Sequence, residues 1–93
     1  MNNPQAWSVE YTADAAAALR RLNTRDKVTA RLVRNALLAV AATGQPRSRG
    51  KALTGDRSGQ WRYRIGDWRA IVEIQDQRLV VLVVEVGHRS KVY

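Results

Sequence analysis

The amino-acid sequence predicts an α+β fold in which a two-helix hairpin packs on one face of a small, mainly antiparallel sheet. Apolar and polar residues alternate in residues 7–11 and again in residues 60–74, which is typical of half-buried strands. Between these segments, apolar residues recur at helical spacing in residues 12–43. A nearly unbroken apolar run at residues 79–86 indicates a central strand covered on both faces. The predicted order of elements is therefore β-α-α-β-β-β.

The first strand and the first helix are predicted from a change of period near residue 12. Residues 7–11 alternate and include β-forming tryptophan, valine and tyrosine. Thr12 or Asp14 can cap the helix that follows, because a side-chain oxygen there accepts a hydrogen bond from a free backbone N–H. We expect this helix to end near Leu22. Its apolar face consists of Ala15, Leu19 and Leu22.

The second helix is predicted to begin near Thr24 and to end near Thr43. Asn23 and Thr24 interrupt the helical pattern, and Thr24 is a suitable N-cap with Asp26 in the first turn, where negative charge is favourable. A glycine and then a proline shortly after Thr43 form a stop signal. The expected apolar stripe consists of Val28, Leu32 and Ala36, broadened by Leu38, Ala39 and Val40.

The two strands after residue 60 are predicted to form a tight hairpin around a Gly66-Asp67 turn. Counting outward from this turn pairs Ile65 with Trp68, Arg64 with Arg69, Tyr63 with Ala70 and Arg62 with Ile71. Residues 45–58, before the hairpin, read as a basic loop. We expect Ala52 and Leu53 either to anchor this loop to the core or to form a short strand end.

Alternation along the strands gives the predicted hairpin two different faces. Arg62, Arg64 and Arg69 share one face, and the other is apolar: Trp61, Tyr63, Ile65, Ala70, Val72 and Ile74. The helices are expected to cover the apolar face and to leave the arginine face open. Arginines directly opposite each other repel and weaken a sheet, whereas a polyanion would bind them. The alternative is a solvated face on which Glu73 neutralises one arginine.

The charge of the chain limits the classes of partner. The formal net charge is +8 at pH 7 for a chain of 10.5 kDa. Lys27, Lys51 and Lys91 are the only lysines among the 16 basic residues, so arginine dominates. Guanidinium groups bind phosphate bidentately, and the composition therefore favours nucleic acid, an anionic membrane or an acidic protein. Charge alone does not choose among them.

Several classes of site are excluded by the residues that the sequence lacks. Without cysteine, disulfides and thiolate metal sites are impossible. One histidine and scattered carboxylates predict no metal site and no cofactor. Residues 1–6 lack the features of a signal peptide, and the longest apolar run, residues 79–84, is too short to span a bilayer. We expect residues 1–93 to form one cytoplasmic domain without a membrane partner.

Two segments carry a family resemblance. Residues 61–72, Trp-Arg-Tyr-Arg-Ile-Gly-Asp-Trp-Arg-Ala-Ile-Val, and residues 86–93, Val-Gly-His-Arg-Ser-Lys-Val-Tyr, resemble the RelE branch of the RelE/ParE toxin superfamily. Residues 53–55, Leu-Thr-Gly, match the leucine–glycine step of that family, and element order and length agree across essentially the whole chain. The resemblance implies a RelE-like, microbial RNase-like fold and a bacterial type II toxin.

The resemblance also implies an activity and partners. RelE-type toxins enter the A site of the 30S ribosomal subunit and cleave mRNA there, in contact with mRNA and rRNA. A cognate antitoxin protein wraps and blocks the toxin, commonly in a heterotetramer. The functional positions of the family correspond here to Arg62, Arg64, Arg69, Arg89 and Tyr93. Lysine often occupies the first two of these positions in the family, and the segment from Arg89 to Tyr93 is shorter than in some members.

Metal-free RNA cleavage by the 2′-hydroxyl needs a base, an acid and positive charge around the phosphorane. Arginine suits the third role, but its pKa above about 12 makes it a poor proton carrier. His88 and Tyr93 remain as titratable candidates. We assign acid/base catalysis or base stacking to Tyr93 and acid/base catalysis to His88. Which group takes the proton stays open.

A second basic set is expected to contact RNA: Arg47, Arg49, Lys51, Arg57 and Lys91. The alternative for the loop residues is a solvated surface. Two rival functions also stay open. A ParE-type gyrase inhibitor has the same fold without nuclease chemistry. A non-catalytic module would only bind RNA or an antitoxin.

Overall fold

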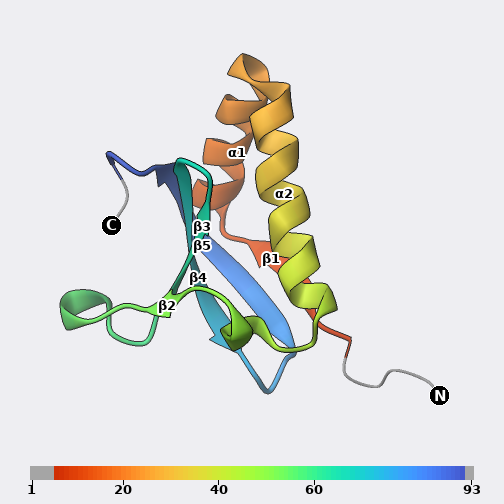
Figure 1. The fold of residues 1–93 in the computed structure, drawn as a ribbon, viewed down its shortest axis with the longest axis vertical. Coiled ribbons are helices and arrows are strands. Elements are labelled where there is room, and N and C mark those ends of the chain that lie inside the picture. The colour runs from red at the N-terminus through yellow and green to blue at the C-terminus, as the bar shows by residue number, and fades with distance from the viewer. Residues whose placement is uncertain (1–5, 92–93) are drawn as a thin grey trace.

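The computed structural model describes residues 6–91 (Figure 1). The described chain begins with β1 (Ser8–Tyr11), α1 (Ala13–Arg25) and α2 (Lys27–Ala42). A connecting segment follows, with the short helical turns η1 (Pro46–Ser48) and η2 (Gly55–Arg57) on either side of β2 (Lys51–Ala52). The last three strands are β3 (Trp61–Ile65), β4 (Trp68–Gln75) and β5 (Val80–His88).

The strands form one sheet in the order β1-β5-β4-β3-β2. β1 runs parallel to β5, and the other neighbouring strands are antiparallel. Both helices lie on one face of the sheet, and the segment with β2 lies on the other side (Figure 1). The predicted α+β fold is confirmed, and the expected strand end before the hairpin is the short edge strand β2.

The β3–β4 hairpin has the predicted register. Ile65 pairs with Trp68 and Arg64 with Arg69, on either side of the Gly66-Asp67 turn. Gly66 has a φ of 61°, a left-handed conformation that glycine adopts without a steric penalty. The positions of the arginines on this hairpin therefore follow from the turn alone.

The junction between the helices differs from the prediction. α1 starts as expected, with the Thr12 hydroxyl accepting a hydrogen bond from Ala15 N–H (3.2 Å). It then continues through Thr24 to Arg25, because the Thr24 hydroxyl bonds back to the Arg20 carbonyl (3.2 Å) and does not cap. Asp26 is the N-cap of α2 instead, and its carboxylate accepts from the backbone N–H (3.1 Å) and the hydroxyl (2.6 Å) of Thr29.

The predicted apolar stripe of α2 is wrong in most of its positions, although Val40 is buried and Ala36 packs against the core as expected. Val28, Leu32 and Leu38 are 77%, 55% and 56% exposed. The buried residues of α2 are Ala30, Val33, Leu37, Val40 and Ala41. α2 is apolar on more than one side, so helical spacing alone did not distinguish its two stripes, and packing on the sheet buries the other one. Neither α1 nor α2 combines the length and the apolar character that crossing a bilayer requires.

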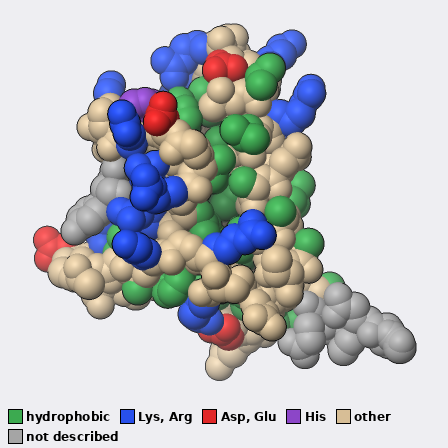
Figure 2. Space-filling model, viewed as in Figure 1, with side chains coloured by type: hydrophobic (Ala, Val, Ile, Leu, Met, Phe, Trp, Pro, Cys, Tyr) green, Lys and Arg blue, Asp and Glu red, His purple; other side chains and the backbone are tan. Residues whose placement is uncertain are grey.

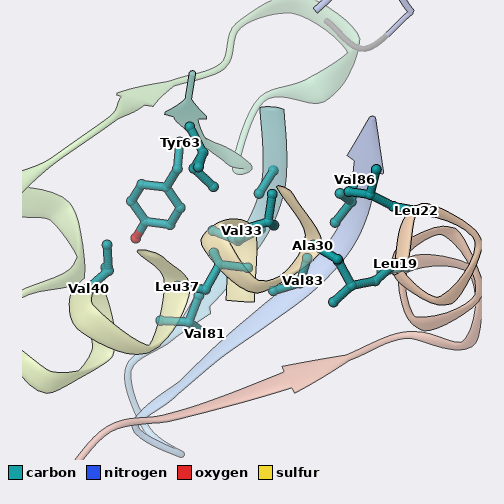
Figure 3. Packing of buried hydrophobic residues seen from close by; sticks show 14 residues of the cluster. Leu19, Leu22, Ala30, Val33, Leu37, Val40, Tyr63, Val81, Val83 and Val86 are labelled. Carbon is teal, nitrogen blue, oxygen red and sulfur yellow. The ribbon is translucent and has the colours of Figure 1, made fainter. Parts of the chain in front are cut away.

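The main core lies between the helices and the sheet. Leu19 and Leu22 of α1 and Val33 and Leu37 of α2 pack against inward-facing side chains of β3, β4 and β5 (Figure 3). Tyr63 enters this core from β3, and its hydroxyl donates to the Pro46 carbonyl (2.6 Å). This bond ties the connecting segment to the sheet.

A second, smaller core lies on the opposite face of the sheet. Leu53, from the connecting segment, packs with Ile71, which is fully buried, and with Val84. The face with Arg62, Arg64 and Arg69 was expected to be open. The segment around Leu53 covers this face at Ile71 and Val84, whereas Arg64, nearer the Gly66-Asp67 turn, is exposed.

Candidate functional site

The pairing of the strands places basic side chains in neighbouring rows on one face. Lys51 of β2 is opposite Arg62 of β3. Two residues further along the hairpin, Arg64 is opposite Arg69, and Arg69 is opposite Gly87 of β5. Glycine brings no side chain to that row, so the guanidinium groups meet no bulky neighbour there. Basic side chains gather on this part of the molecule (blue, left in Figure 2).

Four arginines share one electrostatic environment. The pKa of Arg69 lies below its ordinary value, first because desolvation disfavours the charged form, and then because of the positive charges of Arg64, Arg62 and Arg89. Asp67 acts in the opposite direction. Mutual repulsion of this kind destabilises a free protein and is relieved when an anion binds.

Arg62 has the most constrained position of the four. Its side chain is half-buried, and its Nε is buried without a hydrogen-bond partner among the described residues. A buried donor without an acceptor costs about 1–3 kcal/mol, so such groups call for a specific reason. An oxygen of a bound anion would supply the missing acceptor.

Arg89 is held at the cluster by the hairpin turn. Its backbone N–H donates to the Asp67 carbonyl (2.8 Å), and its Nε lies 3.8 Å from the Asp67 carboxylate. The guanidinium group of Arg69 is also held there, since it donates to the carbonyls of Gly66 (3.2 Å) and Trp68 (3.1 Å). The turn thus positions one arginine from β4 and one from beyond β5.

The connecting segment is fixed against β3 beside Arg62. The Trp61 indole N–H donates to the Arg49 carbonyl (2.6 Å). Gly50 approaches β3 so closely that a Cβ at this position would collide with the Arg62 carbonyl. Its φ of 81° also requires glycine. This contact holds Lys51 next to Arg62.

The five residues expected to contact RNA do not form one surface. Arg47 is bound bidentately to Asp76 (2.9 Å for both bonds), and Arg57 forms a 2.5 Å ion pair with Glu85. Lys51 joins the arginine cluster through its pairing with Arg62. Arg49 contributes its backbone carbonyl to the bond with the Trp61 indole, and its side chain is exposed. Lys91 lies beyond the end of β5 and lines a separate hollow beneath α1.

Of the two titratable candidates, the structure describes only His88. His88 is opposite Trp68, and the two rings meet edge to face with centroids 5.8 Å apart. Side chains alternate along β5, so His88 lies on the helical side of the sheet, away from the arginine row at Gly87. Its Nδ1 is 2.9 Å from the Ser90 hydroxyl oxygen. Tyr93 lies outside the described residues.

Two acidic residues near the arginines were not expected from the sequence. Asp67 holds Arg89, and Glu85 neutralises Arg57. Both contacts depend on how β4 pairs with β5, where the register shifts between Ile71 and Val72. The role of Asp67 could have been inferred from the local sequence, because an aspartate in a turn beside a strand end is available to bind a basic residue on the neighbouring strand. For Glu85 we find no such signal.

Comparison with known proteins identifies the class. A family model described as the ParE toxin of type II toxin–antitoxin systems matches residues 9–93. The chain belongs to this family, and it is therefore the toxin of a type II toxin–antitoxin system. The expected membership of the RelE/ParE superfamily is confirmed. A search of curated proteins gives no match.

Solved structures agree with this assignment. A chain of the toxin–antitoxin complex RelBE2 from Mycobacterium tuberculosis is 27% identical, with a TM-score of 0.73 and coverage of 90% of this chain and 99% of that chain. The YoeB/ParE toxin from Agrobacterium tumefaciens has 16% identity, a TM-score of 0.74 and coverage of 87% and 96%. YafQ from E. coli has 14% identity, a TM-score of 0.62 and coverage of 90% and 94%. The last two establish similarity of fold.

Proposed function

We propose that this toxin is a ribosome-dependent endoribonuclease that cleaves mRNA in the A site and so inhibits translation. The observation that carries the proposal is the convergence of Arg62, Arg64, Arg69 and Arg89 on one open surface. Four cations at this density suit a backbone phosphate better than any group of the protein itself. Membership of a toxin family makes a cellular target of this kind plausible.

In the proposed reaction, the ribose 2′-hydroxyl attacks the adjacent phosphorus and the 5′-oxygen leaves. One bond forms, one breaks, and the products are a 2′,3′-cyclic phosphate and a 5′-hydroxyl. The arginines donate hydrogen bonds to the phosphate oxygens, whose negative charge grows in the transition state. We expect Arg62 in particular to contact the phosphate, because a phosphate oxygen would supply the acceptor that its buried Nε lacks.

Proton transfer needs a group other than arginine. We propose Tyr93, at the family position, as the acid/base or stacking residue, ahead of His88. The ring of His88 packs against Trp68 and bonds to Ser90 on the helical side of the sheet, so it would need to move to reach the phosphate. Lys51 is the best supported of the expected additional RNA contacts, because it pairs with Arg62.

The proposed partners are a cognate antitoxin, the mRNA and the rRNA of the 30S subunit, and the proposed location is the cytoplasm. Two similar structures are described as toxin–antitoxin complexes, RelBE2 and YoeB–YefM. For this chain an antitoxin would be expected to be acidic, since the net charge is +8. We propose a heterotetramer as the assembly with this antitoxin.

Joint replacement of Arg69 and Arg89 by alanine tests the proposed site. We expect growth inhibition on induction to be lost, because each donor removed typically costs about 10²–10³ in rate. The matched control is Arg20→Ala with Arg31→Ala, which removes the same charge from exposed helix positions and should stay toxic. Circular dichroism must show folded protein in both cases. A folded Arg69/Arg89 variant with full toxicity would refute the proposed site.

Gyrase inhibition is the second candidate, because the matching family model is that of the ParE toxin. That activity needs no nuclease chemistry. It predicts DNA damage signalling on induction while translation continues, and growth inhibition that survives the loss of the arginines. If overexpression of the free chain is harmless, a non-catalytic binding module is the better description.

A further inference from the structure

The exposed apolar surface of the molecule lies on α2. Within residues 6–91, the large hydrophobic side chains that are exposed are Val28, Leu32 and Leu38, and all three belong to this helix. Apolar side chains are visible along its course (green in Figure 2). A single exposed leucine is ordinary, whereas several on the same helix indicate an interaction surface.

The exposed side of α2 has the spacing of a helix–helix contact. Successive intervals of four, three, four and three residues separate five exposed positions, which are Val28, Leu32, Asn35, Ala39 and Ala42. Positions that repeat in this way form one stripe along a helix, as in the seam of a two-helix coiled coil. The stripe extends from the first turn of α2 to the last, over about 21 Å.

This stripe is complementary to itself when two copies lie antiparallel. The larger side chains, Val28 and Leu32, are in the N-terminal half of the stripe, and Ala39 and Ala42 are in the C-terminal half. A two-fold axis at Asn35 places Val28 opposite Ala42 of the second copy and Leu32 opposite Ala39. Large side chains then meet small ones along the whole contact, as close packing requires. A parallel pair would place large against large and small against small.

The charges along α2 favour the same orientation. Lys27 is in the first turn and Arg31 in the second, at the end of the helix where the dipole is positive and a cation is unfavourable. The last turn of α2 has no basic residue to compensate the negative end of the dipole. An antiparallel second copy brings its own Lys27 and Arg31 to that end.

We propose that two copies of this chain associate through α2, which packs antiparallel on α2 of the second copy with Asn35 at the two-fold axis. The interface is isologous, so each contact occurs twice. The two Asn35 carboxamides hydrogen-bond to each other, and a polar pair of this kind within an apolar seam fixes the register. The inference concerns the free chain and depends neither on nuclease activity nor on an antitoxin.

The proposed dimer is weak and leaves the arginine cluster accessible. One helix pair of this length buries less than the about 1,200 Å² of a standard interface, so the association is reversible. The formal net charge of +8 on each copy opposes it further at low salt. The helices lie on the face of the sheet opposite to the arginine cluster, so the contact does not cover the cluster (Figure 1).

A second copy suits this side of α2 better than a lipid surface does. Helices that lie in a membrane interface have a continuous apolar face, and Asn35 at the centre of the stripe would interrupt it. In a helix pair the same asparagine has a partner of its own kind. Matching of the two halves of the stripe by size also has no counterpart in a fluid lipid layer.

Single cysteines test the orientation, because the chain has no cysteine of its own. Under mild oxidation, Asn35→Cys should form a disulfide-linked dimer at least about tenfold faster than Arg20→Cys, an exposed control on α1. Val28→Cys alone should link no faster than the control, because its two copies lie about 21 Å apart along the helices. Mixed with Ala42→Cys, it should form a linked heterodimer.

Two results of this experiment overturn the proposal. Linking of Asn35→Cys no faster than that of Arg20→Cys would mean that α2 does not meet α2. Linking of Val28→Cys to itself as fast as that of Asn35→Cys would mean that the helices pair in parallel.

Sedimentation equilibrium of the full chain tests the association without cysteine. We expect a monomer–dimer equilibrium that becomes stronger as salt rises, because screening reduces the repulsion between the copies. Leu32→Lys should weaken dimerisation about tenfold or more, since it places a charge opposite Ala39. The matched control, Gln77→Lys, adds the same charge at an exposed turn away from α2 and should stay within about twofold.

The remaining outcomes of sedimentation count against the proposal. A chain that is monomeric at every concentration and salt overturns it, as does a dimer that both lysine variants weaken equally. Association that weakens as salt rises would point to charged surfaces rather than to α2. A monomeric chain that pellets with phosphatidylglycerol vesicles, and no longer does so as Leu32→Lys, would make this side of α2 a membrane contact instead.

Discussion

Individual residues keep the arginine surface in place at some cost to the fold. Arg62 has a buried Nε without a partner, and Arg69 is surrounded by positive charge. Three other contacts stabilise this surface. Gly50 packs on β3, Tyr63 bonds to the connecting segment, and Asp67 lies beside Arg89. Two of these contacts give predictions that do not depend on the function.

Replacement of Gly50 by alanine should destabilise the protein. A Cβ would collide with the Arg62 carbonyl and lie 2.6 Å from Trp61 Nε1, in addition to backbone strain of about 1–3 kcal/mol at a φ of 81°. Gly59→Ala is the control, because Gly59 also has a positive φ, of 97°, but nothing within 4 Å of a Cβ. Urea unfolding should give a larger loss for Gly50→Ala. Equal losses would mean that the connecting segment does not pack on β3 as described.

Tyr63 should make stability fall at high pH. Burial raises the pKa of Tyr63 to about 12, above the ordinary 10.0, so the unfolded chain loses this proton first. The contribution of this raised pKa to the free energy of unfolding is complete below pH 10 and is lost as the pH rises toward 12. Tyr63→Phe should be less stable at pH 8, because the Pro46 carbonyl loses its donor, but should lose less further stability between about pH 10 and 12. Parallel pH profiles from urea unfolding would contradict this assignment.

At the scale of elements, the hairpin could be predicted from the sequence and the orientation of α2 could not. A two-residue turn with glycine fixes every pair that follows it, so the positions of Arg62, Arg64 and Arg69 needed only local information. In α2, two apolar stripes have acceptable helical spacing. The choice between them depends on contacts with strands that are distant in the sequence. In the structure these contacts bury Val33 and leave Leu32 exposed.

Alanine substitutions on the two sides of α2 test this orientation. Leu37 is fully buried, so Leu37→Ala should reduce the free energy of unfolding by about 2–5 kcal/mol. Leu32 is 55% exposed, and Leu32→Ala should change it by no more than about 0.5 kcal/mol. The two variants remove the same atoms, which makes each the control for the other. A larger loss for Leu32→Ala would restore the orientation expected from the sequence.

At the scale of the whole molecule, the sheet separates two kinds of surface. One face carries the arginine cluster, and the other carries the two helices. The sequence predicted that the first face is basic and offered Leu53 as a possible anchor of the loop, but it did not predict that Leu53 packs on the arginine face itself. It also did not predict that His88 lies on the helical side, since this follows from the register shift between β4 and β5. Both features depend on contacts between residues that are far apart in the sequence, so local sequence patterns did not predict them.

Cleavage of mRNA on a programmed ribosome is the most direct test of the central proposal. Ribosomes carrying an mRNA with a defined A-site codon would be incubated with the purified toxin, and the RNA ends mapped by primer extension. We expect a cut within the A-site codon that leaves a 5′-hydroxyl, and a rate at least about 100-fold lower for Arg69→Ala with Arg89→Ala. If the mRNA stays intact in this assay although the same toxin arrests growth when it is induced in cells, the nuclease assignment is contradicted.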